Sequence, residues 1–273
     1  MKALARLTPN AWWGLIRGIV CCLLVFYLTA PLIIVLIISF SSAQFLTFPP
    51  PGFSLQWYRN LFRDPVWFNA LLTSVEIMIP AAICATALGT AAAYGLARSR
   101  TKLAGFVTGL ILAPVVVPAI ITAAGIFAVF RNVGLYGTLT GLIIAHTVLT
   151  IPYVFVTVSA GLKVLDPRLE AAAMTLGARP IIVFRRIVLP LILPAVLSGL
   201  LFAMVVSFDE LIVSLFISTP VVRPIAVQMW SNVMGDVDPT IAAVATVLFA
   251  FSLLALMTEH AVRQRRLRVT GDA

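Results

Sequence analysis

Charged residues are scarce in this chain of 273 residues: Asp, Glu, Lys and Arg together make up 11% of it, whereas apolar residues make up 61%. An ordinary soluble domain is about 25% charged and about 45–50% apolar. Both departures point the same way. The sequence therefore predicts a protein that spans a membrane several times, and it excludes an ordinary soluble domain.

Residue types that build catalytic or cofactor sites are equally sparse. The three cysteines, Cys21, Cys22 and Cys84, lie in apolar runs and form no disulfide framework. No Gly-Lys dipeptide occurs, so a phosphate-binding P-loop cannot form. The two histidines, His146 and His260, are far apart in the sequence and lie on separate predicted elements. We therefore predict no catalytic residue, no metal site and no cofactor in this chain.

Long apolar runs dominate what is present. Six of them are long enough to cross a bilayer, which takes about 20 helical residues, and none alternates as a β-barrel strand does. The first run exceeds the core of a signal peptide, about 7–15 residues, so we expect it to remain as a helix. The predicted fold is all-α: one polytopic domain with six transmembrane helices. The expected spans cover residues 19–39, 70–97, 104–130, 135–161, 191–217 and 240–261.

The basic residues are distributed unevenly along the chain, which has a net charge of +9. Fifteen of the 19 Lys and Arg residues lie in the two tails and in the second and fourth connections between spans. Lys and Arg are retained on the cytoplasmic side of a membrane. The pattern therefore predicts an even number of spans with both termini in the cytoplasm, and the positive charge records orientation instead of nucleic-acid binding.

A polar stretch, 170-EAAAMTLGARPIIVFRRIVLP-190, lies between the fourth and fifth predicted spans. Asp166 and Pro167 predict a helix start just before it, because Asp caps free N–H groups and proline is tolerated at the first helical position. Gly177 predicts the helix end, because glycine adopts the left-handed conformation. We expect a helix–turn–helix over residues 163–190 on the cytoplasmic face. It either enters a groove of a partner, with its first acid meeting a basic side chain there, or rests on the membrane.

The spacing of these residues resembles a known signature. Glu170-Ala171-Ala172, then Gly177, then Ile187-Val188-Leu189-Pro190 is similar to the EAA motif in permease subunits of bacterial ATP-binding-cassette (ABC) importers. Residues 48–58, 146–153 and 207–210 resemble the polyamine-type branch of that family. The resemblance implies that the loop is a coupling helix seated in a cleft of an ATPase subunit. Its coupling residues would be Arg168, Glu170, Ala171, Ala172, Gly177 and Pro190.

The same resemblance implies an assembly in the bacterial inner membrane. It would hold a second homologous permease, two ATP-binding subunits that carry ATP and Mg and hydrolyse the ATP, and a periplasmic substrate-binding protein. The implied substrate is putrescine, spermidine or a similar small cation, with an amino-acid-derived or opine-like solute as the alternative. The segment 224–234 is expected to form a short interfacial helix anchored by Trp230. By the resemblance, Trp230 and Arg223 would face the binding protein.

Acidic residues occur inside two predicted spans, where a charge costs about 2.5–3.5 kcal/mol and usually faces protein or water. We predict that a carboxylate there attracts a cation from outside; the pathway candidates are Ser207, Phe208, Asp209, Glu210 and Glu76. The alternative for 207–210 is a capping box in which Ser207 and Glu210 start a new helix and break the fifth span. The alternative for Glu76 is a pair with a basic group of a partner subunit.

Two functions of other classes remain open at this point. A proton-driven secondary carrier would use Glu76, His146 or Asp209 as relays, although many such carriers contain internal repeats, which are not found here. A membrane scaffold would need no pathway at all.

Small residues at four-residue spacing, such as Ala87, Ala91 and Gly95, predict faces on which helices approach closely.

Overall fold

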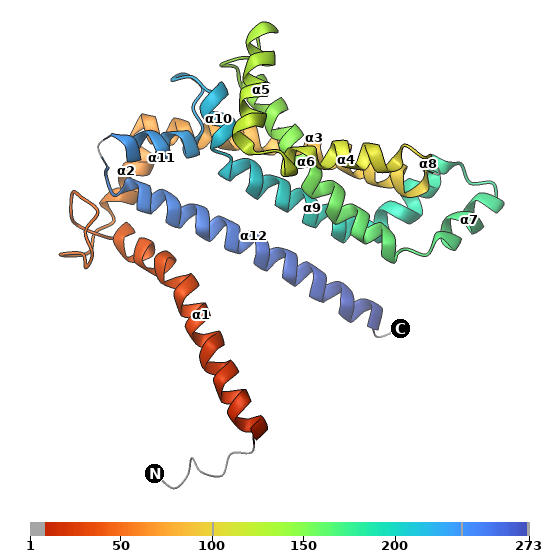
Figure 1. Ribbon diagram of the computed structural model, residues 1–273, viewed down its shortest axis with the longest axis horizontal. Coiled ribbons are helices and arrows are strands. Elements are labelled where there is room, and N and C mark those ends of the chain that lie inside the picture. The colour runs from red at the N-terminus through yellow and green to blue at the C-terminus, as the bar shows by residue number, and fades with distance from the viewer. Residues whose placement is uncertain (1–8, 100, 236, 272–273) are drawn as a thin grey trace. The chain divides into compact units, whose positions relative to one another are not determined.

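The computed structural model describes residues 9–99, 101–235 and 237–271 (Figure 1). These residues are mostly helical and include no strand, apart from one isolated bridge between Ser41 and Phe53. The predicted all-α class is confirmed. The elements in chain order are α1 (Pro9–Ser39), α2 (Gln56–Arg63), α3 (Pro65–Arg98), α4 (Ala104–Val116), α5 (Ala119–Asn132), α6 (Leu139–Val164), α7 (Pro167–Thr175), α8 (Pro180–Val183), the π-helical turn η2 (Phe184–Val188), α9 (Leu189–Asp209), α10 (Ile212–Ile217), α11 (Ile225–Met234) and α12 (Thr240–Gly271).

The chain divides into two compact units. The first comprises the described residues up to Arg63 together with Met234–Phe249, and the second comprises Asp64–Val233 and the described residues from Ala250 onward. In the first unit, the indole N–H of Trp57 donates to the carbonyl of Ser41 at 2.9 Å. The amide of Asn60 donates to the Thr240 hydroxyl at 2.9 Å. These bonds fasten the loop after α1 and the helix α2 to the start of α12.

The core of the second unit is a close packing of α3, α6 and α9. Gly89 of α3 and Gly199 of α9 both face Val154 of α6. A Cβ atom at Gly89 would lie 2.8 Å from Val154 Cβ, and one at Gly199 would lie 3.2 Å from Val154 Cα. In a membrane, where lipid is as apolar as a leucine side chain, such small residues let helix backbones approach and gain van der Waals contact. The three helices therefore meet around one valine.

Four helical stretches in the described residues are long and apolar enough to cross a membrane: Trp12–Ser39, Pro65–Arg98, Leu139–Val164 and Pro180–Asp209. The third predicted span, 104–130, is not one rod, because α4 and α5 meet at 103°. Proline explains the break: Pro118 lacks an N–H and forces the preceding Val117 into an extended conformation. With this bent pair counted as one span, the number rises to five. Thr240–Leu254 is a shorter apolar helix within the sixth predicted span.

The fifth predicted span, 191–217, is interrupted near its outer end, as one of the two alternatives predicted, and differs from expectation at its inner end. At its outer end, α9 stops at Asp209 and α10 begins separately at Ile212. At its inner end, the amphipathic residues before Pro190 and the span itself form one continuous helical stretch, Pro180–Asp209. The π-helical turn η2 ends at Val188, two residues before Pro190. Since a proline ring clashes with the carbonyl four residues earlier, a wider π-helical turn there keeps the helix continuous.

Candidate functional site

The helix α7 begins as its sequence predicts. Asp166 is the N-cap, and its Oδ1 accepts a hydrogen bond from the backbone N–H of Arg168 at 2.9 Å. Pro167 occupies the first turn, where a missing N–H costs nothing because that group has no partner within the helix. The predicted helix start is confirmed.

The helix also ends where the sequence predicts, at Gly177, whose φ is +85°. The N–H of Gly177 donates to the carbonyl of Met174 at 3.0 Å, and that of Ala178 donates to Ala173 at 3.1 Å. This pair of bonds is a Schellman motif, which needs a left-handed residue at this position. No heavy atom lies within 4 Å of the site of a Cβ at Gly177. A side chain there would be strained by backbone conformation and not by crowding.

Large apolar side chains on α7 and its turn point outward. Leu169 and Met174 are exposed, and Leu176 is 89% exposed. We call these three residues the α7 face. The other predicted coupling residues around them are also exposed: Arg168, Ala171, Ala172, Gly177 and Pro190. Large apolar side chains exposed around a short helix beside a basic residue are typical of a surface that another protein covers.

Glu170 is the exception among the predicted coupling residues, because it points inward and is only 5% exposed. It forms an ion pair with Arg98, the last residue of α3. The hydroxyl of Tyr94 donates to its other carboxylate oxygen at 3.0 Å. The acid therefore meets its basic partner within this chain, whereas the sequence led us to expect that partner in another protein.

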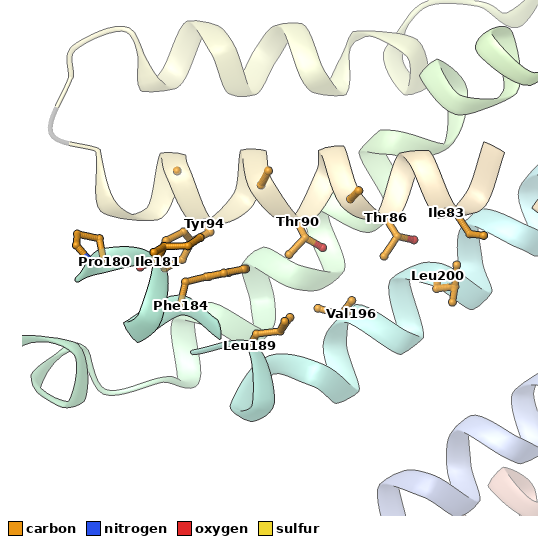
Figure 2. A pocket seen from close by; sticks show the side chains of 13 residues that line it. Ile83, Thr86, Thr90, Tyr94, Pro180, Ile181, Phe184, Leu189, Val196 and Leu200 are labelled. Carbon is orange, nitrogen blue, oxygen red and sulfur yellow. The ribbon is translucent and has the colours of Figure 1, made fainter. Parts of the chain in front are cut away.

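An apolar groove of about 770 Å³ runs between α3 on one side and α8, η2 and α9 on the other (Figure 2). Ala87, Ala91 and Gly95 line it, so the predicted small-residue face borders an open groove instead of a tight helix contact. Two hydroxyl groups also belong to the α3 wall. Thr86 donates to the Ala82 carbonyl at 2.7 Å, as threonine often does in a helix. The buried hydroxyl of Thr90 has no hydrogen-bond partner among the described residues.

The acid pair at the end of α9 has divided roles. Glu210 Oε1 accepts from the N–H of Val213 at 2.8 Å and so caps the start of α10. The predicted break in the fifth span is confirmed, but the predicted capping box is wrong. Ser207 does not cap that helix, because its hydroxyl is bonded to His146 Nδ1 at 2.9 Å. Phe208 between them is half-buried.

Asp209 and Glu76 are both exposed, and neither has a polar partner within the described part of the chain. Glu76 lies two turns before Ile83 on α3 and therefore on the side of that helix that faces the groove. Asp209 lies nine residues after Leu200, so it projects from roughly the opposite side of α9. The two acids thus do not share the groove. The described residues contain no group of three or more His, Cys, Asp or Glu side chains that could hold a metal ion.

His146 of α6 is fully buried and bonded at both ring nitrogens. Its Nδ1 is bonded to Ser207 of α9, and its Nε2 lies 3.0 Å from the hydroxyl of Ser214 in α10. A neutral imidazole has one donor and one acceptor, and a serine hydroxyl can complement either. The histidine therefore holds both sides of the break in the fifth span. Ser207 and Ser214 are seven residues apart and so share one side of a helix, but nothing in the sequence indicated that His146 would bond to both.

The segment after α10 contains the two residues that the family resemblance assigns to the binding-protein side. Arg223 is half-buried and donates to Gln228 Oε1 at 3.0 Å. Trp230 is exposed on α11, which forms as a short helix as predicted. The N–H of Ile225 donates to the hydroxyl of Ser74 at 2.7 Å, which fastens the start of α11 to α3. Contact of this surface with a binding protein stays a prediction.

Comparison with known proteins now defines the class. Residues 85–268 match the family described as "Binding-protein-dependent transport system inner membrane component", and the chain belongs to that family. It is 33% identical over 240 residues to the spermidine/putrescine transport system permease protein PotC of Haemophilus influenzae, covering 88% of this chain and 93% of the relative. It is 37% identical over 230 residues to the putrescine transport system permease protein PotI of Escherichia coli, covering 81% of each.

The fold agrees with this family. The crystal structure of a bacterial ABC transporter involved in the import of the acidic polysaccharide alginate contains a chain that superposes with a TM-score of 0.73. That match covers 95% of this chain and 98% of the other at 14% sequence identity, so it shows a shared fold. The chain is a multi-pass membrane protein and a permease subunit, as the resemblance of its EAA-like residues implied.

Proposed function

We propose that this chain is one of two permease subunits of an ABC importer that carries a polyamine, such as putrescine or spermidine, or a similar small cation. The observation that carries the importer assignment is the α7 face, an exposed apolar surface on a short capped helix between two membrane-spanning helices. Two relatives with polyamine permease names, at 33% and 37% identity, support the substrate class.

In this proposal α7 seats in a cleft of one of two ATPase subunits on the cytoplasmic side, where both chain termini also lie. ATP and Mg are bound by those subunits, and this chain performs no covalent chemistry. When ATP closes the ATPase pair, α7 is displaced and the spans open the pathway outward. A periplasmic binding protein, received near Arg223 and Trp230, then delivers the solute. Hydrolysis restores the inward-facing state.

A reconstituted transporter provides the test. This chain, its partner permease and the ATPase subunits would be incorporated into proteoliposomes, with labelled putrescine or spermidine supplied on its binding protein. Uptake is expected to require both ATP and the binding protein. Uptake by this chain alone under a proton gradient would favour a secondary carrier instead, while ATP-driven uptake of opine-like solutes but not polyamines would remove only the substrate assignment.

Asp209 is expected to contribute to attraction of the cation. Its carboxylate is exposed and has no polar contact among the described residues, so its negative charge is not neutralised by a basic group of the chain. At about 4 Å, a pair of opposite charges is worth roughly 1–4 kcal/mol between bulk water and a protein surface. Asp209→Asn should therefore slow polyamine uptake about tenfold, since about 1.4 kcal/mol corresponds to that factor.

The control for this prediction keeps the charge and alters the shape. Asp209→Glu should retain most of the uptake rate, and both variants should keep the basal ATPase rate of the complex. Initial uptake rates at a fixed concentration of loaded binding protein measure the effect. Equal uptake rates for the wild-type and Asp209→Asn transporters would show that Asp209 does not contribute to attraction of the cation.

A further inference from the structure

Three side chains from two helices form a closed cluster where α3 ends. Both Arg98 Nε, at 3.0 Å, and Arg98 Nη2 donate to Oε1 of Glu170. The Tyr94 hydroxyl donates to Oε2. The two oxygens of one carboxylate are thus shared between two residues that lie one helical turn apart on α3. Hydrogen bonds to an ionised carboxylate are stronger than bonds between neutral groups.

This cluster is a polar attachment of α7 to a membrane-spanning helix, and the half-buried Ala173 adds an apolar contact with the hydrophobic core of the second unit. Glu170 is the one buried residue among the nine of α7, all of which the structure describes. Its neighbours Ala171 and Ala172 are exposed, and Arg168 in the first turn is exposed as well. The one buried side chain of α7 therefore gives this helix a directional, hydrogen-bonded link to another element. That element is the end of α3.

The cluster extends to the start of the fifth span through Tyr94. The ring of Tyr94 lies 4.8 Å, centre to centre, from the ring of Phe184, the first residue of η2. Figure 2 shows these two rings together at one end of the groove. The guanidinium of Arg98 also lies 5.9 Å from the centre of the Tyr94 ring. One network therefore joins α7, the end of α3 and the turn that leads into α9.

We propose that Glu170, Arg98 and Tyr94 form an internal tie that transmits displacement of α7 to α3 and to the groove between α3 and α9. In this inference, which rests on the proposed function, Glu170 is a positioning residue bound within its own chain and is not the group that holds the ATPase subunit. The α7 face supplies that contact instead. Arg98 and Tyr94 are then as necessary for coupling as Glu170 itself.

A double-mutant cycle on the complete reconstituted transporter tests the tie. The variants are Arg98→Gln, Glu170→Gln and the two combined, and the readout is the number of solute molecules imported per ATP hydrolysed. Each single change should lower this ratio about tenfold, and the double change should lower it no further, because either one already breaks the pair. Tyr94→Phe, which removes one bond and keeps the ring, should lower it about two- to threefold. Arg131→Gln, an exposed basic residue on α5, is the control and should leave it unchanged.

Two results would overturn the tie. One is a double variant whose loss is the product of the two single losses, about a hundredfold. The other is a normal ratio for Arg98→Gln beside a reduced one for Glu170→Gln, which would show that Glu170 acts on another protein. Absence of ATP-dependent uptake by the wild-type complex would instead contradict the proposed function.

Hydrogen exchange provides a second test that does not depend on transport, so it can be applied to variants that fail to assemble into a transporter. Hydrogen exchange of the purified full chain in detergent should become about tenfold faster across residues 167–175 in Arg98→Gln, while exchange across α6 stays unchanged. Unchanged exchange in α7 would show that the pair does not hold that helix and would overturn the proposal.

Discussion

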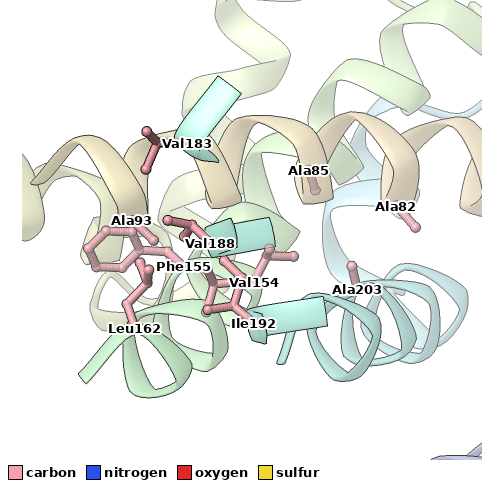
Figure 3. Packing of buried hydrophobic residues seen from close by; sticks show 11 residues of the cluster. Ala82, Ala85, Ala93, Val154, Phe155, Leu162, Val183, Val188, Ile192 and Ala203 are labelled. Atoms are coloured by element: carbon pink, nitrogen blue, oxygen red, sulfur yellow. The ribbon is translucent and has the colours of Figure 1, made fainter. Parts of the chain in front are cut away.

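Replacing Gly89 by valine is expected to lower both the yield and the thermal stability of the folded chain. A Cβ atom at this position would lie 2.8 Å from Val154 Cβ, closer than real Cβ atoms approach their neighbours, and 3.2 Å from the carbonyl oxygen of Ile151, which is a tight contact (Figure 3 shows Val154 within its cluster). The second neighbour is backbone, so the clash is relieved only when α3 and α6 move apart. Overpacking in a close-packed core costs about 1–3 kcal/mol, and separation of the helices also weakens the packing around Val154.

The loss at Gly89 is measured as the yield of monodisperse protein in detergent and as the midpoint of its thermal unfolding. Gly109→Val in α4 is the matched control, because nothing lies within 4 Å of a Cβ there. The control should unfold within a few degrees of the wild type. Equal midpoints for the two variants would contradict the close packing of α3, α6 and α9 described here.

The second large effect is expected from Glu170→Lys, which should abolish ATP-driven uptake while ATP hydrolysis continues. The substitution places an ammonium group beside the Arg98 guanidinium at a position that is 5% exposed in the native chain. Leaving one partner of a fully buried ion pair without its counterpart costs about 3–5 kcal/mol. The cost is smaller here because Arg98 is 30% exposed, but a second like charge adds repulsion. We expect α7 to detach from α3, because that removes the lysine from the site.

The measurement compares uptake with ATPase rate in the same proteoliposomes. An uptake loss of at least a hundredfold, with an ATPase rate within about twofold of the wild type, is the expected result. Glu170→Asp, which keeps the charge on a shorter side chain, should retain part of the uptake. Normal import by the lysine variant would show that neither the ion pair nor this acid has a part in coupling.

How far the sequence predicted the structure depends on the distance over which each signal acts. Asp166 and Gly177 mark the ends of α7 through bonds to residues a few positions away, so the sequence alone located both. The ion pair of Glu170 with Arg98 joins positions 72 residues apart. Tyr94 and Arg98, at i and i+4, share one face of a helix, but no local pattern tells which loop will cover that face.

Hydrophobic length predicted six spans, whereas the described residues contain four helical stretches long and apolar enough, or five with the bent pair, and length gave no sign of the bend. Pro118 lies inside the third predicted span, and a proline there indicates a kink, but the bend of 103° also depends on how α4 and α5 pack after the break. The break after α9 was predicted from a capping box in which Ser207 starts the new helix. In the structure the Ser207 hydroxyl is bonded to His146, and Glu210 caps α10. Likewise α3 packs tightly against α6 at Gly89, whereas the predicted face of Ala87, Ala91 and Gly95 lines the groove.

The central claim is that the α7 face lies in the cytoplasm and is covered by an ATPase subunit. It is tested most directly with Leu176→Cys in a chain from which Cys21, Cys22 and Cys84 have been removed, using a maleimide that does not cross membranes. The account predicts labelling in inverted vesicles stripped of peripheral proteins, protection when the ATPase subunits are added back, and no labelling in intact spheroplasts. Labelling from outside in spheroplasts, or labelling that the ATPase subunits leave unchanged, would contradict it.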